Sequence, residues 1–145
     1  MKKNLKRDPY ITHKELTVPD VFYHMSKGKE RLQINKDMSV NLLSQRLILF
    51  RLKGVVCVSC GRVGTVFKAQ SHSKGNQVIP HLNLYTADGF LMTKDHILAK
   101  ASGGKDHLSN YQTMCAPCNS RKGSKVPEGI VLNAKSNSNK TLSSS

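Results

Sequence analysis

The 145-residue sequence lacks any long apolar run. No apolar stretch approaches the roughly 20 residues that a membrane-spanning helix requires, so no membrane span is predicted. The basic start, residues 1–7, is like the opening of a signal peptide, but Asp8, Pro9, His13 and Lys14 stand where its apolar core would lie. We therefore expect a soluble protein of the cytoplasm.

Acidic residues are scarce as well. Only 9 Asp and Glu stand against 23 Lys and Arg, which gives a formal net charge of +14. Such a surplus attracts polyanions and releases their condensed counterions, so nucleic acid is the first partner to consider. We expect DNA, with RNA as the alternative nucleic acid. A basic surface that serves solubility alone is the other interpretation.

Cysteine occurs only four times, but the four copies form two CxxC pairs, Cys57 with Cys60 and Cys115 with Cys118. In a reducing cell such cysteines are more plausibly metal ligands than disulfides. Two pairs complete a tetrahedral zinc shell without an open position, which predicts a structural zinc site. Zinc binding could contribute on the order of 10 kcal/mol to the folding of so small a core. The 54-residue gap between the pairs exceeds common zinc-finger spacings, and a redox dithiol is the alternative.

The chain divides by composition into three predicted parts. Residues 1–38 are polar and interrupted by Pro and Gly, and they show no sustained periodicity. This indicates an irregular basic arm, with partial order at most around Val21-Phe22-Tyr23. Residues 39–126 form the predicted zinc-stabilised domain, with its core at 55–123. Residues 127–145 are too polar to bury a core and are predicted to be a flexible tail.

Within the predicted domain, hydrophobic spacing and turn residues predict the elements. Apolar residues at helical spacing after Ser39 predict a helix over residues 40–53 that Gly54 ends. The Asp88-Gly89 pair predicts a hairpin of residues 81–86 and 90–98. The remaining expectations are short strands at 55–57 and 111–114, a loop over 71–77 and a helix that begins at Asn119 and ends near Gly123 or at Pro127.

Asp95, His96 and Asn119 have the chemistry that phosphodiester hydrolysis requires: a base to deprotonate water and groups that hold a cation. An imidazole titrates near neutrality, which suits a base, and carboxylate and amide oxygens suit Mg²⁺. Asn119 directly follows Cys118, so the zinc site would also place it. Taken singly, Asp-His is often surface polarity, Asn119 a helix cap and Asn110 a turn residue. Their order relative to both CxxC pairs favours one joint site.

The same stretch contains an ordered series of short motifs. They are Asp95-His96-Ile97, Gly103-Gly104, Leu108-Ser109-Asn110-Tyr111-Gln112 and Cys115-Ala116-Pro117-Cys118-Asn119-Ser120-Arg121-Lys122-Gly123. This series, within residues 55–123, resembles the HNH (His-Me finger) endonucleases. It looks closest to the zinc-containing branch with two CxxC pairs, which includes phage-encoded enzymes, so the location would be the host cytoplasm for a phage protein.

The resemblance implies an α+β treble-clef/ββα-metal fold with a structural four-cysteine zinc site, preceded by the helix and the basic arm. It also implies metal-dependent hydrolysis of DNA that leaves 5′-phosphate and 3′-hydroxyl ends. His96 matches the general base, Asp95 and Asn119 match the ligands of a catalytic Mg²⁺ or Mn²⁺, and Asn110 matches the residue that orients the His. Asn119 stands where the family often has His. Charge and position alone predict phosphate contacts at Lys94, Arg121 and Lys122.

Two questions stay open at this point. Adjacent strand residues point to opposite faces, so Asp95 and His96 can serve one site only if the strand ends or twists there. A non-catalytic, zinc-stabilised DNA- or RNA-binding module that keeps the fold is the alternative to an endonuclease. Residues 61–90 are more than a minimal module needs and could carry substrate contacts.

Overall fold

The computed structural model describes residues 9–74, 79–125, 130–132 and 142–144. These residues fall into two compact units, each made of two stretches of the chain. Unit 1 consists of Met1–Ser44 and Gly64–Leu91, and unit 2 consists of Gln45–Val63 and Met92–Ser145. In the described ranges no helix combines the length and the apolar character needed to cross a membrane.

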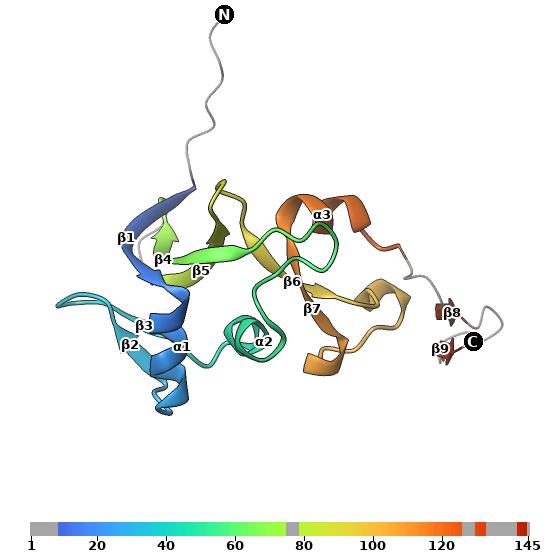
Figure 1. Cartoon of the computed structure of the whole chain (residues 1–145), viewed down its shortest axis with the longest axis horizontal. Coiled ribbons are helices and arrows are strands. Elements are labelled where there is room, and N and C mark those ends of the chain that lie inside the picture. The colour runs from blue at the N-terminus through green and yellow to red at the C-terminus, as the bar shows by residue number, and fades with distance from the viewer. Residues whose placement is uncertain (1–8, 75–78, 126–129, 133–141, 145) are drawn as a thin grey trace, which may run out of the picture. The chain divides into compact units, whose positions relative to one another are not determined.

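Unit 1 is built on a three-stranded antiparallel sheet in the order β1-β4-β5 (Figure 1). Its strands are β1 (Tyr10–Thr17), β4 (Gly64–His72) and β5 (His81–Thr86). Leu16, Phe67 and Leu84 are paired across the strands, and all three are buried. Helix α1 (Val18–Ser26) packs on this apolar face, where the rings of Phe22 and Phe67 lie 6.0 Å apart. This burial forms the core of unit 1.

The other face of the same sheet is polar. The buried amide of Gln70 accepts hydrogen bonds from Asn83 and Tyr85 and donates one to Thr12. Because each of these bonds stays within the sheet, the polar side chains are satisfied inside unit 1.

Residues 10–33 contradict the predicted irregular arm over 1–38. They form β1, α1 and the strand β2 (Arg31–Gln33), while residues 1–8 lie outside the described ranges. Only one side chain of β1, Leu16, is buried, so the strand carries no clear period of two. Its order comes from pairing with β4, 49 to 62 residues away in the chain, which no local pattern reveals.

The predicted helix over 40–53 is correct at its end and wrong at its start. Ser39–Asn41 form β3, which pairs with β2, and helix α2 begins at Gln45 and runs to Lys53. The Asn41 side chain accepts a hydrogen bond from the Leu43 backbone N–H, and this local turn separates strand from helix. At the other end, Gly54 takes a positive φ of 100°.

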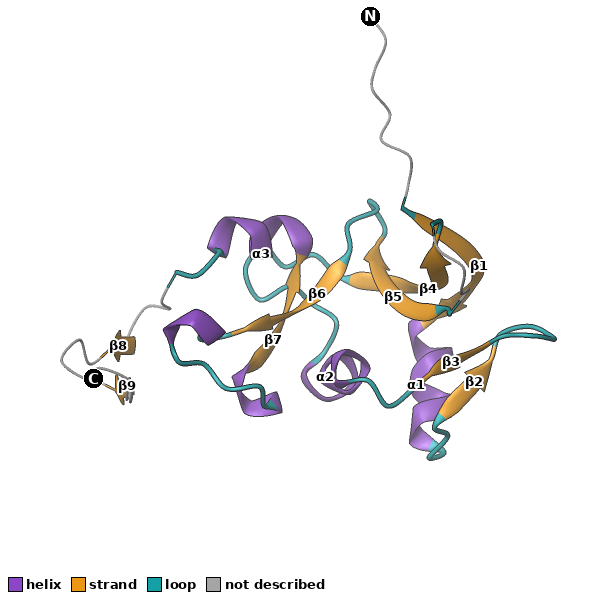
Figure 2. Cartoon of the chain, turned by 180° about the vertical axis from the view of Figure 1, so that it is seen from behind, coloured by secondary structure: helices purple, strands orange, loops and turns teal. Residues whose placement is uncertain are grey.

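Unit 2 contains an antiparallel pair of strands followed directly by a helix. The strands are β6 (Met92–His96) and β7 (Tyr111–Cys115), and the helix is α3 (Ala116–Lys122). Their register pairs Met92 with Cys115 and His96 with Tyr111. Helix α2 packs against both strands (Figure 2), and it contributes the buried Leu47, Leu49 and Phe50. The 3-10 helices η1 (Lys100–Ser102) and η2 (Leu108–Asn110) lie between the strands in sequence.

The predicted hairpin is wrong in its pairing. β5 has the predicted bounds and Gly89 makes the predicted turn with a φ of 88°. However, β5 pairs with β4 and β6 pairs with β7, and only the Tyr85–Leu91 bridge follows the turn. The predicted loop over 71–77 is likewise shorter, because Ser71 and His72 still belong to β4; residues 75–78 lie outside the described ranges.

The other expectations are met in part. The strand at 111–114 and the helix end at Gly123 are confirmed, but α3 begins before Asn119, at Ala116. The strand at 55–57 is reduced to a bridge between Val56 and Val63.

The described part of the predicted flexible tail contains a small hairpin. β8 (Ile130–Leu132) pairs with β9 (Leu142–Ser144), so these segments differ from the prediction. Backbone pairing does not require the apolar side chains whose scarcity suggested a tail. Residues 126–129, 133–141 and 145 lie outside the described ranges. The functional boundaries at residues 39 and 126 stay a prediction.

Candidate functional site

The four cysteines of unit 2 meet at one point. Cys57, Cys60, Cys115 and Cys118 place their sulfur atoms within 4.8 Å of one another. The Sγ atoms of Cys60 and Cys115 are 3.7 Å apart. Four thiolates on a tetrahedral zinc, each about 2.3 Å from the ion, would be separated by about 3.8 Å. The cluster therefore has the donor set and the size of a zinc site.

Backbone hydrogen bonds bring the two cysteine pairs together. The Gly61 N–H donates to the Cys57 carbonyl at 3.0 Å, and the Cys57 N–H donates to the Arg62 carbonyl at 2.8 Å, which closes a tight turn. The Val58 N–H donates to the Thr113 carbonyl, so this turn is fastened to β7 just before Cys115. The second pair stands at the junction of β7 and α3.

Two arginines donate to the sulfur atoms. Arg62 reaches Cys60 Sγ at 3.3 Å, and Arg121 reaches Cys118 Sγ at 3.1 Å. The backbone N–H and the guanidinium of Arg62 help to lower the pKa of Cys60 to about 6. Burial raises the pKa of Cys115 to about 11. The Cys60 thiol is thus easier to ionise than the Cys115 thiol, so a cation bound at the cluster must displace the proton of Cys115.

A cavity of about 340 Å³ lies at the end of β6, and one of its lining residues, Asn119, directly follows Cys118 in the sequence. Asp95, His96 and Asn119 line it together, although the last is more than 20 residues from the others. β6 ends at His96, and Asp95 and His96 both line this cavity. Its other lining residues are Lys94, Ala99, Lys100, Ala101, Lys122, Gly123 and Ser124.

Asp95 is buried, with 6% of its surface exposed. Its Oδ2 atom accepts a hydrogen bond from Gln112 at 2.9 Å and lies 3.1 Å from the Lys122 ammonium. That ammonium also donates to the His96 carbonyl at 2.6 Å. A buried carboxylate is stable only when it is paired in this way. Lys122 therefore holds the carboxylate and the end of β6 together.

His96 is partly exposed and lies between an aromatic ring and a carboxylate. Its ring meets the Tyr111 ring edge-on, with centroids 5.1 Å apart. Its Nε2 atom is 2.7 Å from Oδ1 of Asp106, a residue of the loop between β6 and β7. The Asp106 carboxylate also pairs with Lys100 at 2.7 Å. These hydrogen bonds, first to Lys100 and then to His96, lower the pKa of Asp106 to about 2.

Asn119 stands on the first turns of α3, one residue after Cys118. Its side-chain nitrogen donates to the Thr93 hydroxyl at 2.9 Å, and that hydroxyl donates to the Met114 carbonyl. This hydrogen bond ties the Asn119 side chain to β6 through its nitrogen, so the amide oxygen takes no part in the bond.

Asn110 fastens the loop between β6 and β7. Its side chain accepts from the Leu98 N–H and donates to the carbonyls of Leu98 and Lys105, each at 2.9 Å. Its own carbonyl accepts from the Ile97 N–H. Gly104 fits the same loop because a side chain there would overlap the Leu98 carbonyl. The contacts of Asn110 thus hold the residues next to His96 and next to Asp106.

Comparison with known families agrees with this geometry. Residues 86–140 match the model of the HNH endonuclease family. This segment carries an HNH endonuclease domain. No curated protein and no solved structure gives a significant match to the chain.

The three basic residues predicted to bind phosphate in the HNH segment each have a partner within unit 2. Lys94 donates to Gln45 at 3.1 Å and lies 4.2 Å from the Tyr111 ring centroid. Arg121 donates to Cys118, and Lys122 to Asp95 and His96. Of these three residues, Lys94 and Lys122 line the cavity and Arg121 does not.

Sequence reasoning missed several residues around the HNH motif. Asp106 is the main one, and a signal existed: it is the only acidic residue between Asp95 and Glu128. Gln112 and Thr93, which hold Asp95 and Asn119, are found only through the pairing of β6 with β7. Tyr111 was noted as part of the motif, but its position against His96 follows from the same register.

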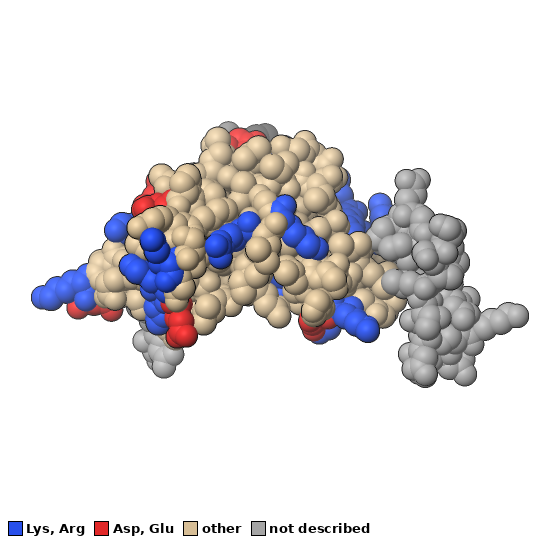
Figure 3. All heavy atoms as spheres, turned by 60° about the horizontal axis from the view of Figure 1, so that its bottom comes forward, with Lys and Arg blue, Asp and Glu red and all other residues tan. Residues whose placement is uncertain are grey.

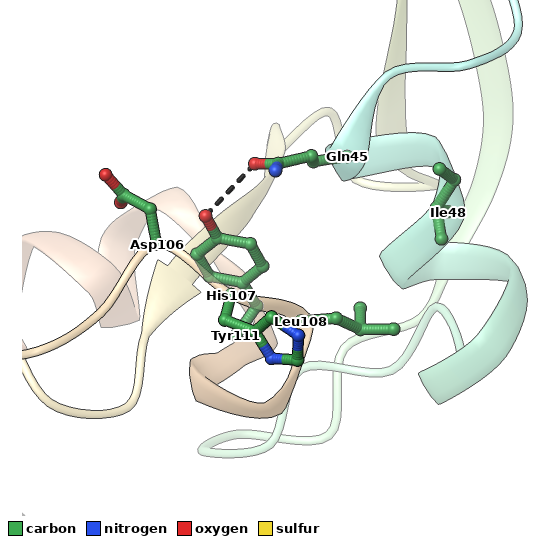
Figure 4. A pocket seen from close by; sticks show the side chains of 6 residues that line it. All are labelled: Gln45, Ile48, Asp106, His107, Leu108 and Tyr111. Atoms are coloured by element: carbon green, nitrogen blue, oxygen red, sulfur yellow. Dashed lines mark hydrogen bonds between the residues drawn. The ribbon is translucent and has the colours of Figure 1, made fainter.

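A second cavity of about 220 Å³ is lined by residues of α2, of the loop between β6 and β7, and by Tyr111 (Figure 4). Ile48 of α2, Leu108 and Tyr111 give it an apolar lining, and Gln45 accepts the Tyr111 hydroxyl at 3.0 Å. The Asp106 carboxylate points away from Ile48 and Leu108 (Figure 4). The loop that carries Asp106 therefore borders both cavities.

Proposed function

We propose that the HNH segment is a metal-dependent endonuclease that hydrolyses phosphodiester bonds in DNA and leaves 5′-phosphate and 3′-hydroxyl ends. The observation that carries this proposal is the cavity in which Asp95, His96 and Asn119 meet. A general base and two hard oxygen donors are the groups that metal-assisted phosphodiester hydrolysis requires. The match of residues 86–140 to the HNH endonuclease family supports the same reaction.

The oxygen atoms in this cavity fit a divalent cation such as Mg²⁺ or Mn²⁺. Oδ1 of Asp95 has no hydrogen-bond partner among the described residues, since both contacts of this side chain are made by Oδ2. The Asn119 nitrogen is bound to Thr93, which leaves the amide oxygen for a cation. Carboxylate and amide oxygens are ligands that Mg²⁺ prefers. When bound there, the cation would supply positive charge near the phosphate and its leaving oxygen.

The remaining steps belong to side chains of the protein. The His96 imidazole accepts a proton from the attacking water, and the resulting hydroxide attacks phosphorus. Lys122 is held against Asp95 and the end of β6, so its positive charge lies beside the cavity. Gln112 and Thr93 keep Asp95 and Asn119 in place. Lys94 also lines the cavity, and we propose it as a phosphate contact there.

The cysteine cluster is proposed to be a structural zinc site of the treble-clef/ββα-metal type. Its four sulfur atoms would fill the coordination shell, and no position would remain for water. Cys118 and Asn119 are neighbours on α3, so the ion that fixes the first also fixes the second. β6, β7 and α3 would form the ββα element around the catalytic residues.

DNA as the partner is supported by the charge of unit 2. Its described residues hold ten Lys and Arg and only two acidic side chains, Asp95 and Asp106. On the face shown in Figure 3, Lys and Arg side chains of the molecule are spread out rather than gathered in one patch. Spread charge suits contacts with a phosphate backbone more than reading of individual bases.

The proposal is tested by incubating the purified protein with supercoiled plasmid, linear DNA, branched DNA and RNA, each with Mg²⁺, Mn²⁺ or EDTA. Wild type should cut DNA with the metals and not with EDTA. His96→Ala is the matched control, since a contaminating nuclease would be indifferent to it. If wild type and His96→Ala bind DNA equally and neither cuts any substrate, the non-catalytic binding module is the better account.

A further inference from the structure

The loop between β6 and β7 brings a second acidic side chain to the proposed base. Asp106 Oδ1 lies 2.7 Å from Nε2 of His96, which is the distance of a strong, charge-assisted hydrogen bond. The imidazole side chain is only 23% exposed, whereas that of Asp106 is 50% exposed. A half-exposed carboxylate does not need this bond for its own solvation, so the consequence of the bond lies in the imidazole.

The bond determines which ring nitrogen of His96 carries the proton. An ionised carboxylate can only accept hydrogen bonds, so Nε2 must be the protonated nitrogen in the neutral ring. Asp106 is ionised at neutral pH, because its pKa is lowered to about 2 by the hydrogen bond from Lys100 and then by that from His96. The lone pair of the neutral imidazole is consequently on Nδ1. Among the described residues, Nδ1 has no hydrogen-bond partner.

Neighbouring contacts hold the carboxylate at this place. Lys100 binds its second oxygen, Oδ2, at 2.7 Å. Asn110 binds the backbone of Leu98, two residues after His96, and of Lys105, one residue before Asp106. The two ends of the hydrogen bond are therefore fixed by one side chain.

We propose that Asp106 is a positioning residue for His96: it holds Nε2–H and so presents Nδ1 as the atom that takes the proton from water. This inference rests on the proposed endonuclease function. When Nδ1 accepts the proton, the ring becomes an imidazolium that Asp106 stabilises as an ion pair. The hydroxide forms the new bond to phosphorus, the bond between phosphorus and the 3′ oxygen breaks, and the 3′ oxygen takes up a proton from solvent. The proton later returns from Nδ1 to solvent, and Asp106 stays ionised throughout.

The first measurement is made on the full-length, zinc-loaded protein without substrate. Long-range ¹⁵N–¹H spectra of the histidine rings distinguish the two neutral tautomers, and His96→Ala assigns the signal. Wild type should show the Nε2–H tautomer for His96, and Asp106→Ala should show a mixture or the other tautomer. An unchanged Nε2–H signal in Asp106→Ala would overturn the proposal.

The second measurement is single-turnover cleavage with DNA affinity determined separately. Asp106→Ala should lower the cleavage rate roughly 10- to 100-fold, less than the loss expected for the base itself. Its zinc content should be unchanged and its DNA affinity equal or higher. Asp106→Glu should recover part of the rate, and Lys100→Met should lose less than Asp106→Ala.

Asp37→Asn is the matched control, because it removes one exposed carboxylate from unit 1 and changes the net charge equally. It should cut at the wild-type rate. If wild type cuts no substrate, the proposed function fails. If wild type cuts and Asp106→Ala cuts as fast, or loses only affinity, the positioning role fails while the proposed function stands.

Discussion

The two units of this chain differ in what fills their cores and in how they carry charge. Unit 1 buries aliphatic and aromatic side chains between a sheet and a helix, and its buried amides bind one another. Unit 2 has three cysteines among its buried residues, Cys57, Cys115 and Cys118. Unit 2 also buries Leu47, Leu49 and Phe50. We expect a zinc ion at the cysteine cluster to stabilise unit 2 in addition to this core.

The charge shows the same contrast. The described part of unit 1 holds seven basic and five acidic residues, whereas that of unit 2 holds ten and two. Unit 2 also contains every residue of the candidate site. Asp95 and Asp106 are the two acidic residues in the described part of unit 2, and both belong to the proposed site.

The largest expected effect is the unfolding of unit 2, but not of unit 1, when the proposed zinc is removed. Chelation, or Cys118→Ser, should unfold unit 2 and leave unit 1 protected, because the proposed structural zinc would contribute on the order of 10 kcal/mol. Hydrogen exchange resolved by peptide measures both units in one sample. Acid should act in the same direction, since protons compete for thiolates and burial holds the pKa of Cys115 at about 11.

Leu84→Ala is the reciprocal variant for this experiment. It removes a fully buried side chain from unit 1 and should cost about 2–5 kcal/mol there without releasing zinc. If chelation lowers the protection from hydrogen exchange equally in both units, the claim that zinc stabilises unit 2 alone is wrong.

A second comparison uses one glycine from each unit. Gly104→Ala forces the Leu98 carbonyl aside and should cost about 1–3 kcal/mol while displacing the loop that carries Asp106. Gly28→Ala, where a side chain meets open space at a φ of 75°, should cost only about 1 kcal/mol. Melting curves and cleavage rates measure both. A normal cleavage rate for Gly104→Ala would show that the position of the loop that carries Asp106 does not affect catalysis.

Much of unit 2 could be predicted from sequence, because its information is local and chemical. The CxxC pairs, the Asp-His pair and Asn119 have fixed order and spacing, and the structure brings each group together. Their roles stay predictions. Asp106 was missed because its isolation among basic residues marks it as unusual but assigns it no role. Its contact with His96 depends on the loop that Asn110 closes.

Unit 1 was largely missed for the opposite reason. β1 pairs with β4 across 49 to 62 residues, and β5 pairs with β4 rather than with the strand that follows its Asp-Gly turn. The local pattern marked the turn correctly but could not tell which strand would be its neighbour. Pairing over such distances is decided by the packing of α1 and Phe67, which no short window contains.

A third prediction concerns the arginines beside the sulfur atoms. Arg62→Met removes the donor to Cys60 and should weaken zinc binding about 10-fold, the lower end of what such outer contacts contribute. Competition with a chromophoric chelator measures the affinity. Arg51→Met in the same unit, whose side chain is exposed, is the control. Equal zinc affinity for the two variants would show that the N–H···S bond contributes nothing.

The smallest expected effect compares charges between the units. Lys105→Ala and Lys125→Ala remove exposed cations of unit 2 and should each lower the salt slope of DNA binding by about 0.9 if that lysine contacts a phosphate. Lys36→Ala in unit 1 is the matched control and should change the slope less. A larger change for Lys36 would move the proposed DNA contact to unit 1.

The most direct test of the central claim is a metal titration of single-turnover DNA cleavage with wild type, His96→Ala, Asp95→Ala and Asn119→Ala. His96→Ala should lose roughly two to four orders of magnitude in rate at every metal concentration, the range for a general base, and keep its zinc and DNA affinity. Asp95→Ala and Asn119→Ala should be rescued in part by raised Mg²⁺ or Mn²⁺, since they weaken the cation site instead. Equal cleavage by wild type and His96→Ala, or rescue of His96→Ala by metal, would contradict the account.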